Sequence, residues 1–504
     1  MLDWLLKLEH MESFWLLPIK VIIFGMFTLG LTACVEVAGQ SVSETSLGSR
    51  PNIILIFVDD LGYGDPGCYG GTLVPTPNMD SLAREGVQFT DGYVTAPLCA
   101  PSRSGLLSGA YQQRFGMQWN PDLGEGRYAV PDGHKLMPQA LAEAGYTTGI
   151  VGKWNMPHKA ADFFDEVSDE MHFVGNYFPE ADGRYAGVDG VTPLPYAEWQ
   201  HDWGPDLPSD EYLTDRLSRH AVDFVRRHRD KPFFLYLAYN APHSPFQAKH
   251  EHNKQFKEIN PEPLRLYAGM VAAIDEGMGQ ILKALRDEGL DERTLIAFVS
   301  DNGPDWADAR YANWSEEWPN GILMGSAGPL AGNKAMFLEG GLRVPFILRW
   351  PGKIQAGQVY REPVMSFDLY PTFCAAAGTT VPPHTTCDGV DLLPYLDGSR
   401  LGSPHEILFW KADGMGAVRK GDWKLIVNPT EPLRQLFNLK EDIGETRDMA
   451  KEKPELLASL LAAYTKWTDT LPPPARQKVG IFLSAEEDIA NRKKEVELKK
   501  KGQP

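Results

Sequence analysis

The sequence predicts an α/β fold that is built on a large, mostly parallel sheet. Continuous apolar runs at residues 52–58, 233–239 and 294–299 are typical of strands that are buried on both faces of a sheet. Two longer segments, residues 211–229 and 264–288, precede the second and third runs and have the pattern of helices. These observations together indicate a central sheet that is flanked by helices.

The length of 504 residues is enough for one large domain and a smaller one. After about Leu396 the pattern changes to four short segments between residues 406 and 438, which are typical of antiparallel strands joined by tight turns, and a helix follows at residues 454–471. We therefore divide the chain into a lipoprotein signal peptide (1–33), a tether (34–50), the main domain (51–395), a C-terminal subdomain (396–475) and a charged tail (476–504).

The charge balance limits the kinds of partner that the protein can have. Its formal net charge of -18 at pH 7 argues against nonspecific binding to nucleic acid, and we predict no nucleic-acid partner. An anionic ligand would have to be attracted by a local group of positive side chains. The five cysteines are too few for a disulfide scaffold.

The N-terminal segment has the features of an export signal. Residues 21–31 form an apolar run that follows Lys20 and is too short for a comfortable membrane span. Residues 31–34, Leu-Thr-Ala-Cys, resemble a bacterial lipobox in which Cys34 would carry the lipid. We expect an exported bacterial lipoprotein that is attached to the membrane through Cys34 and lies in the periplasm or at the outer membrane or cell surface. A plain secretory signal and an uncleaved anchor are the alternatives.

Two further cysteines are close in sequence. Cys374 and Cys387 could form a disulfide in an oxidising compartment. Two structural thiols are an equally good interpretation, and the sequence does not decide between them.

Polar side chains follow two of the predicted buried strands. Asp59 and Asp60 come directly after the run at residues 52–58, and Asp301 and Asn302 come shortly after the run at 294–299. Open α/β sheets bind ligands at the carboxyl ends of their strands. Adjacent carboxylates repel each other and need a cation or a cationic partner. Because all four side chains offer oxygen ligands, the set suits a hard divalent ion, Ca²⁺ above all. For Asp59 and Asp60 alone, a helix cap and a surface acid would be the simpler reading.

A cysteine at a predicted helix start is the most reactive feature of the chain. Residues 99–109 should form a helix that runs to about Tyr111, with Pro101 in its first turn. Cys99 would then lie at the helix N-terminus, where free N–H groups and the helix dipole favour an anion. One turn on, Arg103 adds a fixed positive charge with fork geometry for an oxyanion. The simpler alternative is a buried cysteine before a helix.

Residues 99–109 resemble the signature of the type I, formylglycine-dependent sulfatases, Cys-x-Pro-Ser-Arg-x-x-x-Leu-Thr-Gly, with Ser108 in place of the threonine. The resemblance covers about residues 50 to 450. It implies an alkaline-phosphatase-like fold and a maturation enzyme that oxidises Cys99 to formylglycine, whose hydrated aldehyde is the nucleophile. It also implies one Ca²⁺ ion, with ligands from Asp59, Asp60, Asp301, Asn302 and the converted Cys99.

A second motif departs from the family pattern. Residues 152–155 read Gly-Lys-Trp-Asn, where the family has Gly-Lys-Trp-His. The resemblance implies that Lys153 contacts a sulfate oxygen and that the family's histidine handles the proton of the formylglycine hydroxyl. Asn155 replaces this histidine, and an amide cannot accept a proton at working pH. His158, three residues on, could take its place, although a histidine at the surface or in contact with substrate is the simpler interpretation.

Two more segments carry expected site residues. His243 lies between prolines just after the run at 233–239, and the resemblance makes it the general acid for the leaving alcohol. Lys334 lies in a segment that resembles the second sulfate-binding lysine of the family. We expect Glu339 and Arg343 to brace this segment.

The resemblance implies hydrolysis of sulfate monoesters, with a sulfated carbohydrate or polysaccharide as the expected substrate. Residues 155–212 form a long irregular stretch, and loops of this length are usually functional. His172, His201 and Trp203 within it could shape a sugar pocket. Two alternatives are a phosphate or phosphonate ester hydrolase of the same superfamily and a non-catalytic, sulfated-glycan-binding relative.

Overall fold

The computed structural model describes residues 50–120, 130–131, 133–171, 175–179, 211–307, 321–412, 414–428 and 434–475. The predicted signal peptide, nearly all of the tether and the charged tail lie outside the described residues, as do His172, His201 and Trp203. Among the described helices, none combines the length and the apolar character that a bilayer-spanning helix needs.

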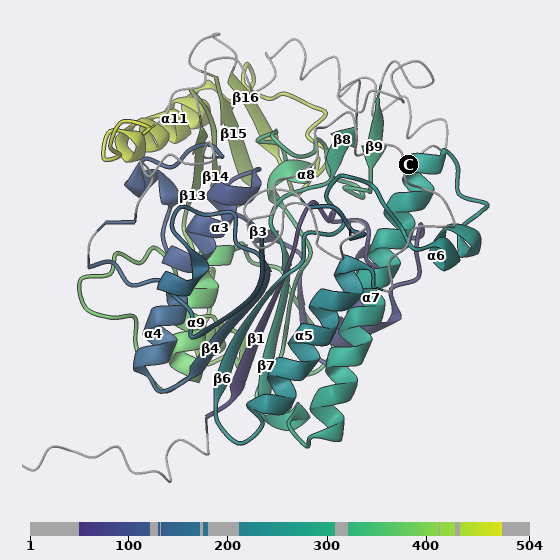
Figure 1. Ribbon diagram of the computed structural model, residues 1–504. Helices are drawn as coiled ribbons and strands as arrows, with labels where there is room; N and C mark the ends of the chain where they lie inside the picture. The colour runs from purple at the N-terminus through teal and green to yellow at the C-terminus, as the bar shows by residue number, and fades with distance from the viewer. Residues whose placement is uncertain are drawn as a thin grey trace, which may run out of the picture. The chain divides into compact units, whose positions relative to one another are not determined.

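Parallel pairing of buried strands forms the centre of a large sheet (Figure 1). β1 (Asn52–Val58) lies between β6 (Phe233–Ala238) and β7 (Thr294–Ser300) and is parallel to both. Beyond β6 follow β4 (Thr147–Lys153) and β5 (Glu166–Met171), which are also parallel. Every residue of β1, β6 and β7 is buried, as the continuous apolar runs predict.

The other side of the sheet is mixed. β10 (Phe346–Arg349) is antiparallel to both β7 and β2 (Val87–Phe89), and β11 (Gln358–Tyr360) pairs with β2 in parallel. The strand order is β11-β2-β10-β7-β1-β6-β4-β5. This order confirms the prediction of a mixed, mostly parallel central sheet.

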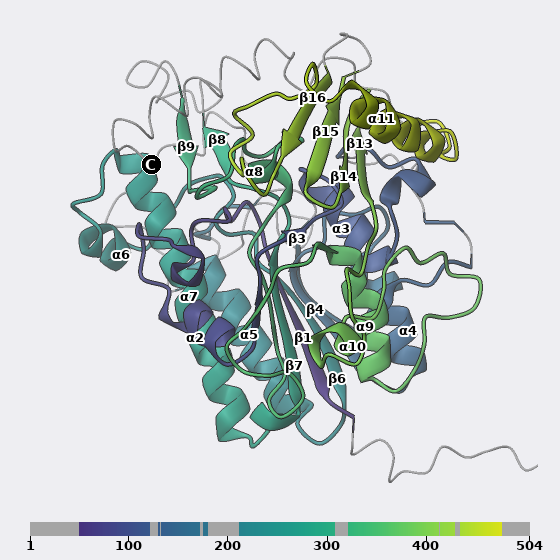
Figure 2. The same ribbon diagram turned by 180° about the vertical axis from the view of Figure 1, so that it is seen from behind.

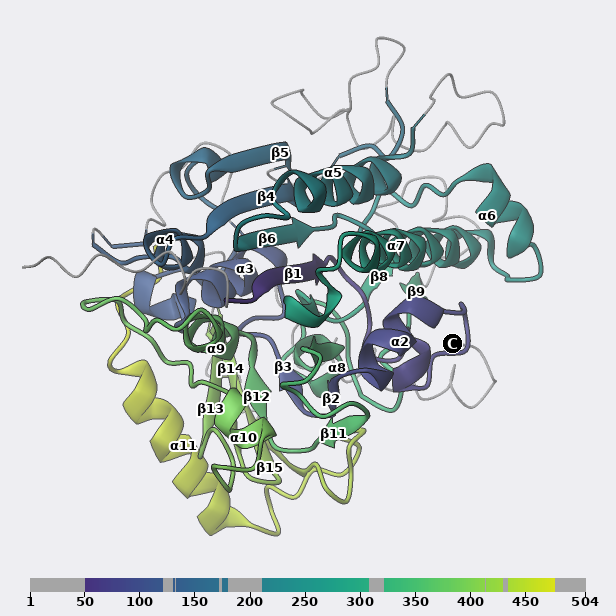
Figure 3. The same cartoon turned by 90° about the horizontal axis from the view of Figure 1, so that it is seen from below.

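Helices cover both faces of this sheet (Figures 1 and 3). Because successive strand residues point to opposite faces, Ile54 and Ile56 of β1 enter one buried cluster, whereas Ile53 and Leu55 enter another. The first cluster includes residues of α2 (Pro77–Arg84), α5 (Leu213–Arg227) and α7 (Glu262–Asp287); the second includes residues of α3 (Cys99–Ser108), α4 (Met137–Glu143) and α9 (Leu369–Ala376).

The C-terminal segments form a separate antiparallel sheet, which Figure 2 shows from behind. Its strands follow one another in sequence order, and α11 (Pro454–Thr468) packs against two of them, β14 and β15. This confirms the predicted small antiparallel sheet and its helix. The strands are β13 (Leu408–Ala412), β14 (Met415–Lys420), β15 (Trp423–Val427) and β16 (Arg434–Asn438).

Short elements complete the described chain. Two pairs of short strands lie outside the two larger sheets, and three of the α-helices are short. They are β3 (Gly92–Tyr93) with β12 (Val364–Met365), β8 (Asp305–Ala307) with β9 (Ile322–Met324), and α6 (His250–Gln255), α8 (Glu339–Leu342) and α10 (Leu393–Leu396).

Two sequence predictions differ from the structure. The helix that begins at Cys99 ends at Ser108 rather than near Tyr111, because Gly109 adopts a left-handed conformation (φ 73°) that closes the helix. The stretch from residue 155 to 212 is not irregular throughout, since β5 adds an edge strand there. The polar sequence of β5 has no apolar run, which explains why the strand was not predicted.

Cys374 and Cys387 are both free thiols in this structure. Cys374 is buried, and the Cys387 thiol donates to the carbonyl of Gly389 (Sγ–O 3.7 Å). The structure therefore corresponds to the second of the two interpretations, a pair of structural thiols.

A buried group of charged side chains joins the antiparallel sheet to α8. Lys424 of β15 donates to Glu339 of α8 (Nζ–Oε1 2.8 Å) and pairs with Glu445 (3.0 Å), and all three side chains are inaccessible to solvent. Arg343 also pairs with Glu339 (3.2 Å), which confirms that these two residues brace their segment. Burial opposes the ionisation of Glu339, but the nearby cations, Lys424 first among them, more than offset it and lower its pKa to about 2.

Replacing Lys424 with methionine should lower the free energy of unfolding by about 3–5 kcal/mol, because Glu339 and Glu445 would stay buried without their shared cation. Lys420→Met is the matched control, since Lys420 pairs with Glu406 where both side chains are more than half exposed. The control should lose about 1 kcal/mol or less. Urea unfolding, monitored by tryptophan fluorescence, measures the free energy of unfolding of both variants. Equal losses of this free energy in the two variants would contradict the prediction.

Candidate active site

The carboxyl ends of β1 and β7 bring the predicted oxygen ligands together. Val58 pairs with Ser300 in the parallel register, so the residues that follow each strand emerge side by side. The backbone N–H of Asp60 donates to Asp301 (N–Oδ1 3.1 Å), and the amide of Asn302 donates to Asp60 (Nδ2–Oδ1 2.7 Å). The four predicted ligand residues are therefore neighbours at one buried edge of the sheet.

The cysteine reaches the same place from α3. Its N-terminal residue is Cys99, which is 1% exposed. Ligand atoms of Asp59, Asp60, Cys99 and His243 all lie within 4.8 Å of one another. Burial, followed by the charge of Asp59, raises the pKa of the thiol well above its usual range. The unmodified cysteine is therefore a neutral thiol in this site and not an activated thiolate.

Three contacts hold the start of α3 in position. The backbone N–H of Ala100 donates to Asn120 (N–Oδ1 3.0 Å), and the N–H of Ala335 donates to the carbonyl of Pro97 (2.9 Å). Gly105 lies against Thr95 so closely that a Cβ atom would come 2.1 Å from the threonine Oγ1. Only glycine permits this approach.

Each of the three predicted site cations pairs with a carboxylate. Lys334 donates to Asp60 (Nζ–Oδ2 2.6 Å), Lys153 donates to Asp59, and Arg103 donates to Asp301 (Nη2–Oδ2 2.8 Å). None of these side chains is more than about a tenth exposed. Pairing of this kind is what permits so many charges to be buried at one edge of a sheet. The structure thus brings together all of the lysines and arginines that the sequence singled out for the site.

Arg103 is fixed from several directions. Its Nη1 donates to the carbonyl of Lys153 (3.0 Å) and to the hydroxyl of Tyr236 (3.2 Å), and its guanidinium lies 5.2 Å from the ring centre of Phe57. Burial raises the pKa of Tyr236 to about 12, so the phenol keeps its proton. Arg103 therefore presents its charge in one fixed orientation.

His243 faces the site with one ring nitrogen. Its Nε2 lies 3.7 Å from Asp60 Oδ2, while Nδ1 lies 2.6 Å from the carbonyl of Ser244. Because a carbonyl only accepts, this contact places the ring proton on Nδ1. Burial and the charge of Lys334 lower the pKa of His243 to about 3, so the ring is neutral. The hydroxyl of Tyr177 lies 2.8 Å from the carbonyls of both Asn240 and His243 and braces this loop.

Asn155 lies just beyond β4, two residues after Lys153, the last residue of the strand. This residue is 4% exposed and has a left-handed backbone (φ 47°). Its Nδ2 has no hydrogen-bond partner among the described residues. His158 is exposed, and its ring lies 6.2 Å from that of Phe163. The structure therefore favours a surface role for His158 over the replacement of a buried catalytic group.

The donor set fits a divalent cation. Asp59 Oδ1 and Asn302 Oδ1 are buried acceptors without a hydrogen-bond partner among the described residues. Burial, together with neighbouring carboxylates, raises the pKa of Asp60 to about 7 and that of Asp301 to about 8. Asp59 differs, since Lys153 and the other cations overcome burial and lower its pKa well below the usual range. Unused oxygen acceptors beside crowded carboxylates are what a hard cation such as Ca²⁺ would satisfy.

Family models match nearly all of the described chain. The model described as Sulfatase matches residues 51–379, more than half of the 504 residues. This chain belongs to the sulfatase family. The model described as N-sulphoglucosamine sulphohydrolase, C-terminal, matches residues 332–462 of the same sulfatase. The family and the fold together confirm the predicted type I sulfatase of the alkaline phosphatase superfamily, a sulfuric ester hydrolase.

Relatives of known activity and structure agree with this assignment. The N-acetylgalactosamine-6-sulfatase of Canis lupus familiaris is 33% identical over 394 residues, which cover 74% of this chain and 71% of the relative. Arylsulfatase A of Homo sapiens is 35% identical over 402 residues, covering 74% of each chain. The crystal structure of Ps i-CgsB has a TM-score of 0.72 and 33% identity to this sulfatase, and covers 90% of this chain and 98% of that one.

The residues that hold the site in place were not predicted from the sequence. Asn120, Tyr177 and Tyr236 each fix a site segment through polar contacts with residues distant in the sequence. Tyr236 lies within an apolar strand, where its hydroxyl is a polar atom that needs a buried partner. This need for a partner could have marked Tyr236 as a candidate from the sequence. Nothing in the sequence alone marks Asn120 or Tyr177 in the same way.

Tyr236→Phe should lower kcat for a small aryl sulfate roughly tenfold, because Arg103 loses one of its fixed contacts, a loss of about 1.4 kcal/mol in transition-state stabilisation. Tyr239→Phe is the control, since the Tyr239 hydroxyl bonds Ser218 (2.7 Å) of α5 instead. Both variants should lose about 1 kcal/mol of stability. If both lose activity alike, Tyr236 is structural and does not position Arg103.

Proposed function

We propose that this sulfatase hydrolyses sulfate esters of a sulfated carbohydrate, using formylglycine derived from Cys99 and one Ca²⁺ ion. The observation that carries the proposal is the convergence of Cys99, Asp59, Asp60 and His243 within 4.8 Å, surrounded by buried cations. A thiol whose pKa is raised is a poor nucleophile at neutral pH, which supports conversion of Cys99 by a maturation enzyme.

The residues that would hold the ion are Asp59, Asp60, Asp301 and Asn302, with the converted Cys99 beside them. A bound Ca²⁺ would supply positive charge to the sulfate oxygens and to the nucleophile. Lys153 and Lys334 already contact two of these carboxylates, so their ammonium groups lie where a sulfate beside the ion would also be within reach. Arg103 adds a further fixed charge to the side of the site nearest Asp301.

The chemistry of sulfate ester hydrolysis explains why an aldehyde, rather than a simple hydroxyl, would serve as the nucleophile. A serine that attacked sulfur would remain as a stable sulfate ester, whereas a hydrated aldehyde has a second hydroxyl whose deprotonation expels the sulfate. His243 is the proposed general acid for the leaving alcohol. Its ring is neutral in the free site because burial and Lys334 lower its pKa. The negative charge of a bound sulfate would oppose the effect of Lys334 and favour protonation of the ring.

The substrate class rests on the relatives. The names of several relatives specify sulfated sugars, and a second structure of Ps i-CgsB is in complex with k-i-k-neocarrahexaose. A sulfated saccharide is therefore the proposed substrate of this chain. Export as a lipoprotein, through lipid on Cys34, would bring the enzyme to extracellular polysaccharide. Among the described residues, one group of carboxylate, thiol and imidazole ligands could hold a metal ion, which favours a sulfatase over two-metal phosphatases.

Peptide mass spectrometry of the protein from a host with a maturation enzyme should show a mass deficit at Cys99 that matches conversion of the thiol to an aldehyde. Aryl sulfate hydrolysis should accompany the modification. Cys99→Ser should show neither, although its aspartates and Asn302 should still bind calcium. An unmodified Cys99 in a fully active preparation would refute the formylglycine mechanism.

Asn155→His should add an ionisation to the pH dependence of kcat. A histidine base must be deprotonated to work, so the variant should lose activity relative to the natural protein as the pH falls below about 6.5. Asn155→Ala is the control, which should lose roughly tenfold in kcat at all pH values if the amide only donates a hydrogen bond. If kcat has the same pH dependence in the natural protein and in Asn155→His, the residue at position 155 moves no proton.

A further inference from the structure

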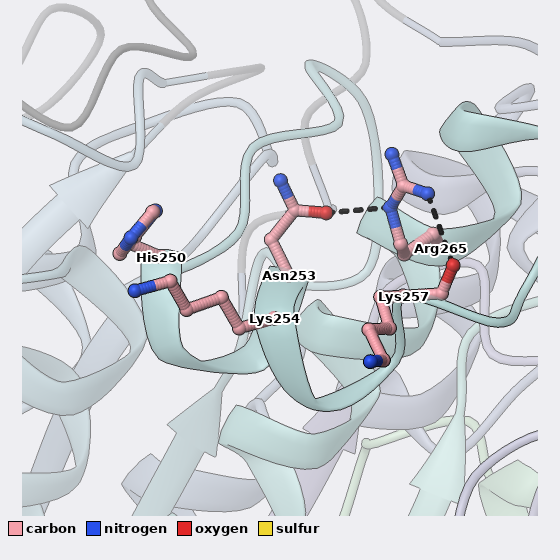
Figure 4. Close-up of a pocket in the computed structure, with 5 residues that line it drawn as sticks. All are labelled: His250, Asn253, Lys254, Lys257 and Arg265. Atoms are coloured by element: carbon pink, nitrogen blue, oxygen red, sulfur yellow. Dashed lines mark hydrogen bonds between the residues drawn. The ribbon is translucent and has the colours of Figure 1, made fainter.

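A pocket lined by basic side chains lies at α6 and the first turn of α7, apart from the site described above (Figure 4). Its volume is about 480 Å³, and its lining residues are exposed or half-buried, so it is an open hollow on the surface. The lining contains no carboxylate. It consists of His250, Asn253, Lys254, Lys257 and Arg265. In a chain of net charge -18, these side chains bring cations together at one place on the surface, with Glu251, Glu258 and Glu262 in the same segment of the chain.

One side of the pocket is held in a fixed geometry. Arg265 donates to the side chain of Asn253 (Nε–Oδ1 2.6 Å) and to Glu262 (Nη2–Oε1 2.8 Å). It also donates weakly to the carbonyl of Lys257 (3.5 Å). Because Asn253 Oδ1 accepts from Arg265, its Nδ2 points away from the guanidinium, as Figure 4 shows, and is available as a donor.

The two lysines of the pocket differ in how far a nearby carboxylate offsets their charge. Both are exposed. Lys257 lies 3.8 Å from Glu258, but the two side chains are 74% and 89% exposed, so solvent screens this pair. Lys254 has no ion pair among the described residues, and its ammonium group lies near His250 in Figure 4. These side chains can therefore attract an anion from solution.

The catalytic cations cannot provide this attraction at a distance. Lys153, Lys334 and Arg103 each face a carboxylate and are almost fully buried, so little of their charge reaches the surface. A polyanionic substrate would meet a repulsive surface unless an exposed group of cations held it. The pocket supplies such a group. Its His250 is seven residues after His243, which limits the distance between their Cα atoms to about 25 Å.

We propose that this pocket is a secondary binding site for a sulfated polysaccharide, which holds the polymer while one of its sulfate groups enters the site at Cys99. This inference rests on the proposed function. Lys254 and Lys257 would attract sulfate groups as point charges, and Arg265 would add planar donors. The amide of Asn253 would donate to a sugar hydroxyl. A small ester in the catalytic site has no part that extends to this pocket.

A binding experiment on an inactive variant tests the pocket separately from catalysis. The double substitution Lys254→Glu/Lys257→Glu, in a Cys99→Ser background, should weaken binding of dextran sulfate about tenfold at low salt, measured by isothermal titration calorimetry. The difference should shrink as salt rises, because exposed charges are screened. The control Lys451→Glu/Lys453→Glu makes the same charge change at two exposed lysines before α11 and should bind nearly as the parent does. Equal weakening in both double variants, or no binding of dextran sulfate by the parent, overturns the inference.

Kinetic measurements distinguish a failure of the pocket inference from a failure of the proposed function. In the Cys99 enzyme, the ratio of kcat/KM for a sulfated polysaccharide to that for 4-nitrocatechol sulfate should fall about tenfold in Lys254→Glu/Lys257→Glu. An unchanged ratio overturns the inference even if the enzyme is fully active. If the parent hydrolyses neither ester but the binding difference persists, the proposed function fails and the pocket stands as a polysaccharide site. Thermal unfolding of each variant shows whether its fold is intact.

Discussion

Charge pairing at the ends of β1 and β7 determines how the whole site is built. The parallel register of these strands places Asp59, Asp60 and Asp301 together in a buried space. Carboxylates in such a space are tolerated only if cations share it. Each cation comes from a different part of the chain: Arg103 from α3 and the others from β4 and the loop before α8.

In the proposed reaction, the same pairing would prepare the site for an anion. Arg103 is oriented by the carbonyl of Lys153, the hydroxyl of Tyr236 and Asp301 before any substrate is present. Donors that are already in place do not have to reorganise when charge develops in the transition state. The left-handed backbones of Asp60 (φ 66°) and Asn155 (φ 47°) belong to this arrangement, since strained residues of this kind persist where the surrounding structure fixes them.

The sequence was most informative where chemistry lies at the end of an apolar strand. Asp59 and Asp301 could be placed together because buried parallel strands share one carboxyl edge, and the cysteine motif carried its own family signature. Asn120 and Tyr177 could not be predicted, because their contacts depend on loops that approach one another only in the folded chain. β5 was missed for a related reason: its polar residues pair with β4 at the sheet edge and need no apolar run.

The contact of Lys424 with Glu339 and Glu445 has a consequence for the history of the fold. The antiparallel sheet looks like a module added to a complete domain, but its lysine neutralises a glutamate that lies five residues after Lys334 in the main domain. Recombination that exchanged this sheet for one without a lysine at that position would leave Glu339 without one of its cations, close in sequence to Lys334. The two parts are therefore expected to be inherited and exchanged as a single unit.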